Sequence, residues 1–237
     1  MKNQKAPPKR ARLLIVDDHP MTRAGLVQLI SNQRDLVVSA EAETARGALA
    51  SVTKSKPDLV LADISLPDKS GIELVKDLKA FAPELPILVI SMHDESLYAE
   101  RVLKAGATGY IMKVAGGKKL MEAIRCVLSG KVYVSDKVSE RILSSFTGKT
   151  PARPSTLIES LSEREFEIFR FLGEGMPASV IARRLHLSTK TIQAHRANIK
   201  AKLGIDSAPR LVAYAALWVA AEGPREADAA ADRAKPV

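Results

Sequence analysis

Short, unbroken apolar runs alternate with helix-periodic segments through the first half of the chain. The runs lie at residues 13–16, 36–38, 59–62, 87–90 and 109–112. Unbroken apolar runs are typical of strands that are buried on both faces, as in a parallel sheet covered by helices. Five such repeats of strand and helix predict a doubly wound α/β domain with a parallel five-stranded sheet.

The second half of the chain changes to a purely helical pattern. Residues 147–156 have the composition of a linker, and a short helix is expected before them at about 136–146. Ser162 and Glu165 have the spacing of a capping box, which predicts a helix that runs from there to about Glu174. Three further helices are expected at about 177–185, 189–203 and 209–221. An all-α, four-helix domain therefore follows the α/β domain.

These patterns divide the 237 residues into two domains with flanking segments. We expect a basic, disordered arm at 1–11, an α/β domain at 12–131, a short helix and linker at 132–157, a helical domain at 158–222, and a disordered tail at 223–237. The tail is rich in alanine, proline and charge, a composition that buries too little apolar surface to fold.

The composition of the chain indicates the cellular compartment in which the protein acts. The basic N-terminal residues are followed by an apolar stretch of only 13–16 before two aspartates, which is too short for a signal peptide. No stretch is long and uncharged enough to span a membrane. The single cysteine, Cys126, excludes an internal disulfide framework and fits a reducing compartment. We therefore expect a cytoplasmic protein without a membrane partner.

Reactive side chains end four of the five predicted strands. Asp17 and Asp18 close the first run, Asp63 the third, Ser91 the fourth and Lys113 the fifth. In doubly wound folds, ligands bind at the carboxyl ends of the strands. Each of these residues alone would mean little, but their joint occurrence predicts one site.

The chemistry of these side chains suits phosphoryl transfer. Three carboxylates repel one another, so their convergence indicates a cation. Mg²⁺ prefers oxygen ligands, and those expected here are Asp17, Asp18, Asp63 and the backbone carbonyl of Ser65. Phosphoryl transfer needs positioning and neutralised charge, which Mg²⁺ and Lys113 would provide. Asp63 is the expected phosphoacceptor, and Ser91 would donate a hydrogen bond to the acyl phosphate.

The first domain resembles the receiver domain of two-component response regulators. The resemblance covers about residues 12–130 and rests on residues 16–20 (VDDHP), 61–67 (LADISLP), Ser91 and 106–113 (GATGYIMK). It implies a flavodoxin-like fold and transfer of a phosphoryl group to Asp63 from a histidine kinase or phosphotransfer protein. It also implies that Ser91 and Tyr110 are a switch pair, and that Ser65 and His93 tune dephosphorylation. Many receivers have proline after the lysine, where this chain has Val114.

A basic, acid-free stretch marks the second domain. The chain carries a net charge of +9, which favours an anionic partner such as nucleic acid. Between residues 175 and 205 there is no aspartate or glutamate, and two predicted helices are joined there by a turn of three residues. These are the features of a helix-turn-helix at about 177–196. A solvated basic helix in an ordinary bundle is the alternative.

The predicted helix at 189–203 has two different faces. Ile192, Ile199 and Leu203 share the face that is expected to pack inward. On the opposite face, small alanines permit close approach to a major groove, and Gln193 has the groups to read adenine. The expected DNA contacts are Arg184, Lys190, Thr191, Gln193, Ala194, Arg196, Ala197 and Lys200.

The second domain resembles the LuxR-type (GerE) helix-turn-helix over about residues 158–221. The matching segments are 161–165 (LSERE), 181–185 (IARRL), 190–196 (KTIQAHR) and 202–204 (KLG). A receiver followed by this domain is the architecture of the NarL/FixJ family. The family often has lysine at Gln193 and Asn-Lys-Glu at 178–180, so base and phosphate contacts cannot be transferred directly. The helix at 209–221 resembles a pairing surface, although a role of Leu211, Tyr214, Leu217 and Trp218 in the core is equally consistent.

The sequence therefore predicts a transcriptional regulator that phosphorylation of Asp63 controls through dimerisation, release of the DNA-binding domain, or both. The expected partners are double-stranded DNA, a kinase, a second copy of the chain and RNA polymerase. The main alternative is a DNA-binding regulator whose receiver acts independently of phosphorylation. A third is a receiver that acts through protein partners. A phosphohydrolase would need a second acid two residues after Asp63, where Ser65 stands. The chain should thus catalyse only its own Mg²⁺-dependent phosphorylation and dephosphorylation.

Overall fold

The computed structural model describes residues 10–146 and 156–222. The chain divides into two compact units, Met1–Pro151 and Ala152–Val237. The expected disordered segments are the arm at 1–11 and the tail at 223–237; residues 1–9 and 223–237 lie outside the described part, as do linker residues 147–155. For Ala11 the expectation is wrong, because this residue begins the first strand. Within the described ranges, no helix has the length and apolar character needed to cross a membrane.

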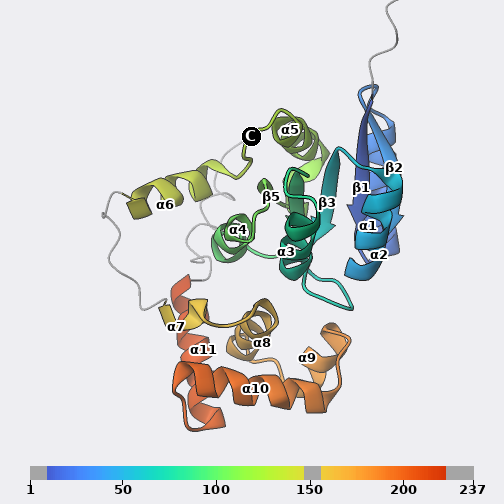
Figure 1. Ribbon diagram of the computed structural model, residues 1–237. Coiled ribbons are helices and arrows are strands. Elements are labelled where there is room, and N and C mark those ends of the chain that lie inside the picture. Colours follow the sequence, from blue (N-terminus) through green and yellow to red (C-terminus); the bar gives the residue numbers. More distant parts are fainter. Residues whose placement is uncertain (1–9, 147–155, 223–237) are drawn as a thin grey trace, which may run out of the picture. The chain divides into compact units, whose positions relative to one another are not determined.

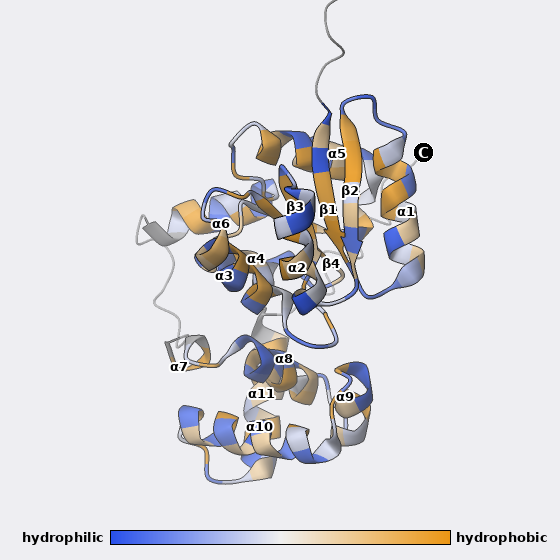
Figure 2. Ribbon diagram, turned by 45° about the vertical axis from the view of Figure 1, so that its right-hand side comes forward, coloured by the Kyte–Doolittle hydropathy of each residue, from blue (hydrophilic) through white to orange (hydrophobic). Residues whose placement is uncertain are grey.

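The first unit contains a five-stranded parallel sheet in the order β2-β1-β3-β4-β5 (Figure 1). The strands are β1 (Ala11–Val16), β2 (Leu36–Ala42), β3 (Leu59–Asp63), β4 (Ile87–Ser91) and β5 (Gly109–Met112). Every residue of β3 and β4 is buried, as the unbroken apolar runs required. The neighbouring strands β1 and β2 are largely orange in Figure 2. The predicted doubly wound α/β fold is confirmed.

Helices connect the strands and cover both faces of the sheet. They are α1 (Pro20–Ser31), α2 (Ala45–Ser55), α3 (Gly71–Phe81), α4 (Glu95–Lys104) and α5 (Gly116–Leu128), with a 3-10 turn η1 at Lys113–Ala115. Helices α1 and α5 contribute Ile30 and Ile124 to one core cluster with alternate strand residues. Helices α2, α3 and α4 pack beside one another on the other face.

The chain beyond α5 packs on the β5 edge of the sheet, which the sequence pattern did not predict. Tyr133 forms a parallel bridge with Gly109, and its carbonyl accepts a hydrogen bond from the Tyr110 N–H at 2.9 Å. A Cβ on Gly109 would lie 2.7 Å from the Tyr133 carbonyl oxygen, so this close approach requires glycine. The predicted helix α6 (Asp136–Phe146) follows and packs against α4.

The second unit is entirely helical. It contains α7 (Thr156–Glu159), α8 (Glu163–Gly173), α9 (Ala178–Arg184), α10 (Thr189–Leu203) and α11 (Ala208–Glu222). Helices α8 to α11 are the four that the sequence predicts, and α7 is an additional turn. The capping box is confirmed: the Glu165 N–H donates to Ser162 Oγ at 3.3 Å, and the Ser162 N–H donates to the Glu165 carboxylate at 2.8 Å. Ser188 caps α10 in a similar way, accepting from the Thr191 N–H at 3.0 Å.

Helix α11 packs closely on α8. Gly173 permits the approach, because a Cβ there would collide with the Ala215 carbonyl oxygen. The Trp218 ring packs edge-on against Phe169, with ring centroids 5.8 Å apart. Of the two roles that the sequence left open for this helix, the structure therefore assigns its aromatic face to the core. Leu217 lies outside that core with 72% of its surface exposed.

Candidate functional site

The parallel register brings the predicted reactive residues to one edge of the sheet. Val16 at the end of β1 pairs with Ala62 of β3, and Asp63 pairs with Ile90 of β4. Asp17 therefore follows its strand beside Asp63, and Ser91 follows one residue further along β4. Because the carboxyl ends of parallel strands meet at the same edge, residues far apart in the sequence become neighbours.

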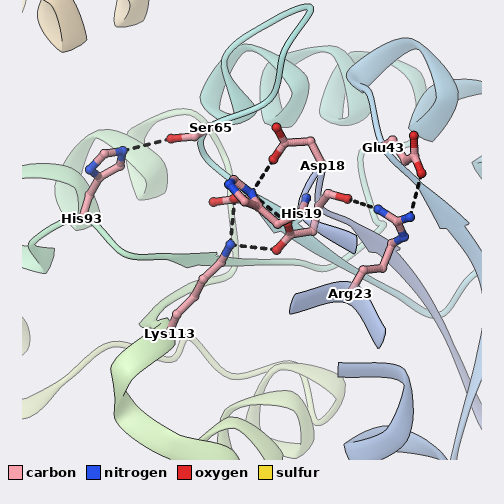
Figure 3. A network of polar contacts seen from close by, with 9 residues as sticks. Asp18, His19, Arg23, Glu43, Ser65, His93 and Lys113 are labelled. Carbon is pink, nitrogen blue, oxygen red and sulfur yellow. Dashed lines mark hydrogen bonds and ion pairs between the residues drawn. The ribbon is translucent and has the colours of Figure 1, made fainter. Parts of the chain in front are cut away.

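Lys113 joins two of the buried carboxylates directly. Its Nζ donates to Asp17 Oδ2 at 2.7 Å and to Asp63 Oδ2 at 2.8 Å. The side chains are 12%, 0% and 4% exposed for Lys113, Asp17 and Asp63. Figure 3 shows the ammonium of Lys113 at the centre of these contacts. The three residues thus form one buried ionic cluster.

The charges in this ionic cluster shift the pKa values of Asp63 and Lys113. Burial raises the pKa of Asp63 above its usual range, against the opposing effect of the Lys113 ammonium. Burial alone would lower the pKa of Lys113, but the Asp63 and Asp17 carboxylates outweigh it and raise that pKa. The two carboxylates thus stabilise the charged form of Lys113, and positive charge near Asp63 favours the ionised form of that carboxyl. A divalent cation supplies such charge.

The acidic pocket fits a hard divalent cation. One ligand atom each from Asp17, Asp18, His19 and Asp63 lies within 4.8 Å of the others. Carboxylate oxygens are the ligands that Mg²⁺ prefers, and three carboxylates against one ammonium leave a negative excess for a cation to balance. His19, whose Nδ1 lies 2.7 Å from Asp18 Oδ1, is a further neighbour that is not among the predicted ligands.

The β3–α3 loop folds back over Asp63. The N–H of Ser65 hydrogen bonds to the Asp63 carboxylate, and this bond lowers the pKa of that carboxyl. The Ser65 hydroxyl lies 3.0 Å from Nε2 of His93, as Figure 3 shows. Gly71 begins α3 so close to Asp63 that a Cβ there would collide with the Asp63 carbonyl oxygen. A glycine is therefore needed for the loop to return to the site.

The expected switch residues lie beneath the same edge. Ser91 Oγ accepts from the His93 N–H at 3.1 Å, and the Tyr110 hydroxyl donates to the His93 carbonyl at 2.7 Å. Burial raises the pKa of Tyr110 far above its usual value, against a hydrogen bond with Ser91. The Tyr110 ring is fully buried, so it has the inward orientation, and it remains a neutral hydrogen-bond donor.

In the second unit, the two faces of α10 differ as predicted. Ile192, Ile199 and Leu203 are buried. The candidate DNA contacts Arg184, Lys190, Gln193, Ala194 and Ala197 are exposed, whereas Thr191, Arg196 and Lys200 are partly buried. The exposed face combines basic, amide and small side chains, which suits close approach to a polyanion.

Two of the candidate contacts are held by neighbours. The guanidinium of Arg184 lies 4.9 Å from the ring centroid of Phe171, a cation–π contact. Thr191 Oγ1 lies 2.8 Å from Ser188 Oγ at the start of α10. Both side chains are therefore restrained close to the turn, at the end of α9 and the start of α10.

A buried carboxylate anchors α10 to α8. Lys202 Nζ donates to Glu165 Oε2 at 2.6 Å. Burial raises the pKa of Glu165, but the hydrogen bonds from Lys202 and Ser162 outweigh it and hold that pKa below its usual range. The capping-box glutamate that the sequence predicts thus has a second role, as the partner of a lysine on another helix.

Each unit matches a known protein family. Residues 13–125 match the response regulator receiver domain, and residues 159–215 match the bacterial regulatory proteins of the luxR family. With the acidic pocket at the sheet edge and the basic helix-turn-helix, these matches define a response regulator with a DNA-binding output domain. Such a protein is a signalling regulator rather than a classical enzyme.

Full-length relatives extend the match across both units. The oxygen regulatory protein NreC of Staphylococcus aureus (strain MRSA252) is 36% identical over 208 residues, or 86% of this chain and 96% of that protein. A LuxR-family response regulator from Aurantimonas sp. SI85-9A1 is 32% identical with a TM-score of 0.55, covering 59% of this chain and 99% of that one. RcsB from Salmonella enterica serovar Typhimurium, bound to promoter P1flhDC with the phosphomimetic BeF3-, is 26% identical with a TM-score of 0.57, covering 87% and 98%.

The chain belongs to the LuxR-type family of two-component response regulators. The architecture of receiver and helix-turn-helix that the sequence resembles is confirmed. Its function is that of a DNA-binding transcription regulator in two-component signalling.

Proposed function

We propose that Asp63 accepts a phosphoryl group from a histidine kinase or phosphotransfer protein and so controls DNA binding by the second unit. The observation that carries this proposal is the Lys113 ammonium, bound by Asp17 and Asp63 in one buried pocket. Mg²⁺ would be held by Asp17, Asp18, Asp63 and the backbone carbonyl of Ser65, and would neutralise charge on the phosphoryl oxygens.

The chemistry at this site is one displacement. A carboxylate oxygen of Asp63 attacks phosphorus, the new oxygen–phosphorus bond forms, and the bond to the nitrogen of the phosphohistidine donor breaks. Lys113 neutralises negative charge that develops on the transferred group. Water later hydrolyses the acyl phosphate, so the chain catalyses only its own phosphorylation and dephosphorylation.

The phosphoryl group would be sensed through Ser91 and Tyr110. The Ser91 hydroxyl turns to the phosphoryl group, and the inward ring of Tyr110 packs behind it. Because the Tyr110 hydroxyl donates to the His93 carbonyl, two residues before α4, this step also acts on the start of that helix. Phosphorylation thereby shifts an existing equilibrium rather than creating a new fold.

Helix α6 offers a route from this switch towards the second unit. Ser135 Oγ donates to Glu95 Oε1 at 2.7 Å, and Arg141 Nη1 donates to the Ser96 carbonyl at 2.6 Å, both in the first turn of α4. The segment that leads to the DNA-binding unit is thus bonded to the helix that follows His93.

We propose boundaries of 12–131 for the receiver, 132–157 for this connecting segment and 158–222 for the DNA-binding domain.

The output is DNA recognition by the helix-turn-helix. Helix α10 enters the major groove, with Gln193, Ala194 and Ala197 near the bases. The expected phosphate contacts are Arg184, Lys190, Thr191, Arg196 and Lys200. A structure of two RcsB dimers bound to two parallel DNAs, 26% identical to this chain with a TM-score of 0.54, supports binding as a homodimer. Cytoplasmic action with RNA polymerase as a further partner completes the proposal.

DNA binding with and without a phosphodonor tests the proposal. Wild type, Asp63→Asn and the matched control Asp77→Asn would be titrated with selected genomic fragments, with and without acetyl phosphate and Mg²⁺. Asp77 is a partly exposed aspartate of α3 that pairs with Lys69, outside the acidic pocket. We expect the phosphodonor to tighten binding of wild type and Asp77→Asn, but not of Asp63→Asn.

Other results would direct the function elsewhere. Equal binding by all three proteins under both conditions would favour the regulator whose receiver acts independently of phosphorylation. DNA binding that is absent or insensitive to salt would favour a receiver that acts through protein partners.

A further inference from the structure

Arg23 of α1 makes hydrogen bonds in three directions beside the acidic pocket. Its Nη1 donates to the backbone carbonyl of Asp17 at 2.7 Å. Its Nε donates to Glu41 at 3.2 Å and its Nη2 to Glu43 at 2.6 Å. The side chain is only 13% exposed. Figure 3 shows this guanidinium on the side of the pocket away from Lys113.

These contacts hold the β1–α1 loop from which the acidic pair projects. The Asp17 N–H donates to the carbonyl of Ala42, which lies between the two glutamates, at 3.1 Å. Arg23 bonds the carbonyl of the same Asp17 and both glutamates. The peptide units on either side of Asp17 are therefore fixed to the end of β2. A rigid guanidinium fork suits this role, since its five donors keep a fixed geometry.

We propose that Arg23 is a positioning residue for the divalent cation: it holds the backbone at Asp17 so that the carboxylates of Asp17 and Asp18 converge. The inference rests on the proposed function of the pocket. Arg23 acts through the backbone and the adjoining loop, without contact between its side chain and the ion. Groups that orient metal ligands typically change affinity about tenfold or more when they are removed.

If Arg23 acted only through its charge, replacing it would change the affinity for the cation in the opposite direction. Replacing Arg23 by methionine removes a positive charge near the pocket and leaves Glu41 and Glu43 without their partner. Both changes make the surroundings more negative and would strengthen cation binding. If Arg23 positions the ligands, the same replacement weakens cation binding. The direction of the change therefore separates the two effects.

The test measures Mn²⁺ binding by electron paramagnetic resonance, which counts the free ion, with Mg²⁺ as competitor. The full chain would be compared as wild type, Arg23→Met, Arg23→Lys and Arg125→Met. Arg125 is the matched control, because it bonds Asp35 at 2.8 and 3.0 Å and Gln33 at 2.8 Å, but at the opposite end of β2. Thermal unfolding would confirm that each variant is folded.

We expect a dissociation constant raised about tenfold in Arg23→Met, raised to a lesser extent in Arg23→Lys, and unchanged in Arg125→Met. Tighter or unchanged binding in Arg23→Met would overturn the inference. Should Arg23→Met not fold, Arg23→Lys decides, because it keeps the charge: unchanged affinity would then refute positioning. A wild type that binds no Mn²⁺ would instead refute the metal site of the proposed function.

Discussion

Replacing Lys113 by methionine removes the ammonium that two buried carboxylates share. Asp17 and Asp63 would remain 0% and 4% exposed with their mutual repulsion uncompensated. Removing one partner of a buried ion pair costs about 3–5 kcal/mol, because a buried charge is left alone. For a domain with about 5–15 kcal/mol of stability, the loss is large but compatible with folding.

The loss of stability in Lys113→Met depends on pH, and the direction of that dependence follows from the pKa of Asp63. Burial already raises this pKa in the folded state, and loss of Lys113 removes its principal opposing charge. A group whose folded pKa exceeds its unfolded pKa favours folding below the unfolded value, and that stability is lost as the pH rises through the folded value. The destabilisation by Lys113→Met is therefore greatest at neutral and alkaline pH and smaller in acid. If Mg²⁺ binds the folded pocket as proposed, its addition should restore part of the loss.

Calorimetry of the full chain, with and without Mg²⁺, measures this change in the receiver. The single tryptophan, Trp218, lies in the second unit, and its fluorescence reports whether that unit is unaffected. Lys104→Met is the control, since its pair with Glu100 is exposed and worth about 0–1 kcal/mol. A Lys113→Met variant that lost no more stability than this control, or lost it equally at all pH values and without response to Mg²⁺, would contradict the role assigned to the shared ammonium.

Four further changes test other parts of the structure. Glu165→Gln should cost the second unit about 1–3 kcal/mol by tryptophan fluorescence, a difference that disappears as the pH falls through the lowered pKa of Glu165. Gly71→Ala should destabilise the receiver by about 1–3 kcal/mol in calorimetry, because its Cβ meets the carbonyl of Asp63. Arg141→Met should leave phosphorylation by acetyl phosphate intact while weakening its effect on DNA affinity, since the bond to α4 is lost. Gln193→Ala should relax preference for one base by about 1–3 kcal/mol in titrations of operator variants, without changing the salt dependence.

The receiver pocket was predictable because its residues follow buried strands. An unbroken apolar run indicates where a parallel strand ends, and all such ends meet at one edge. The proximity of Asp63 and Lys113, which are 50 residues apart, can therefore be predicted from the strand ends alone. The capping box of Ser162 and Glu165 was predictable for a related reason, since both of its bonds are local.

Arg23 and Tyr133 show the limit of the same argument. Arg23 stands in an ordinary helical pattern, and its partners Glu41 and Glu43 lie at the end of the next strand and just after it. Nothing in the spacing indicates that a helix-borne guanidinium reaches the backbone of Asp17. The pairing of Tyr133 with Gly109 joins a single residue to the edge of the sheet, too short a segment to produce a strand pattern.

The sequence does not decide between a core role and a pairing role of α11, and the reason is a different one. Periodicity shows that Leu211, Tyr214, Leu217 and Trp218 recur along one helix, but an apolar stripe has the same period whether it packs in a core or on a second molecule. The aromatic contacts with α8 assign Tyr214 and Trp218 inward, and Leu211 is fully buried. Leu217 alone of these four remains largely exposed. A pairing surface on α11 would therefore have to be built around Leu217 and its exposed neighbours, because the rest of the stripe already stabilises the domain.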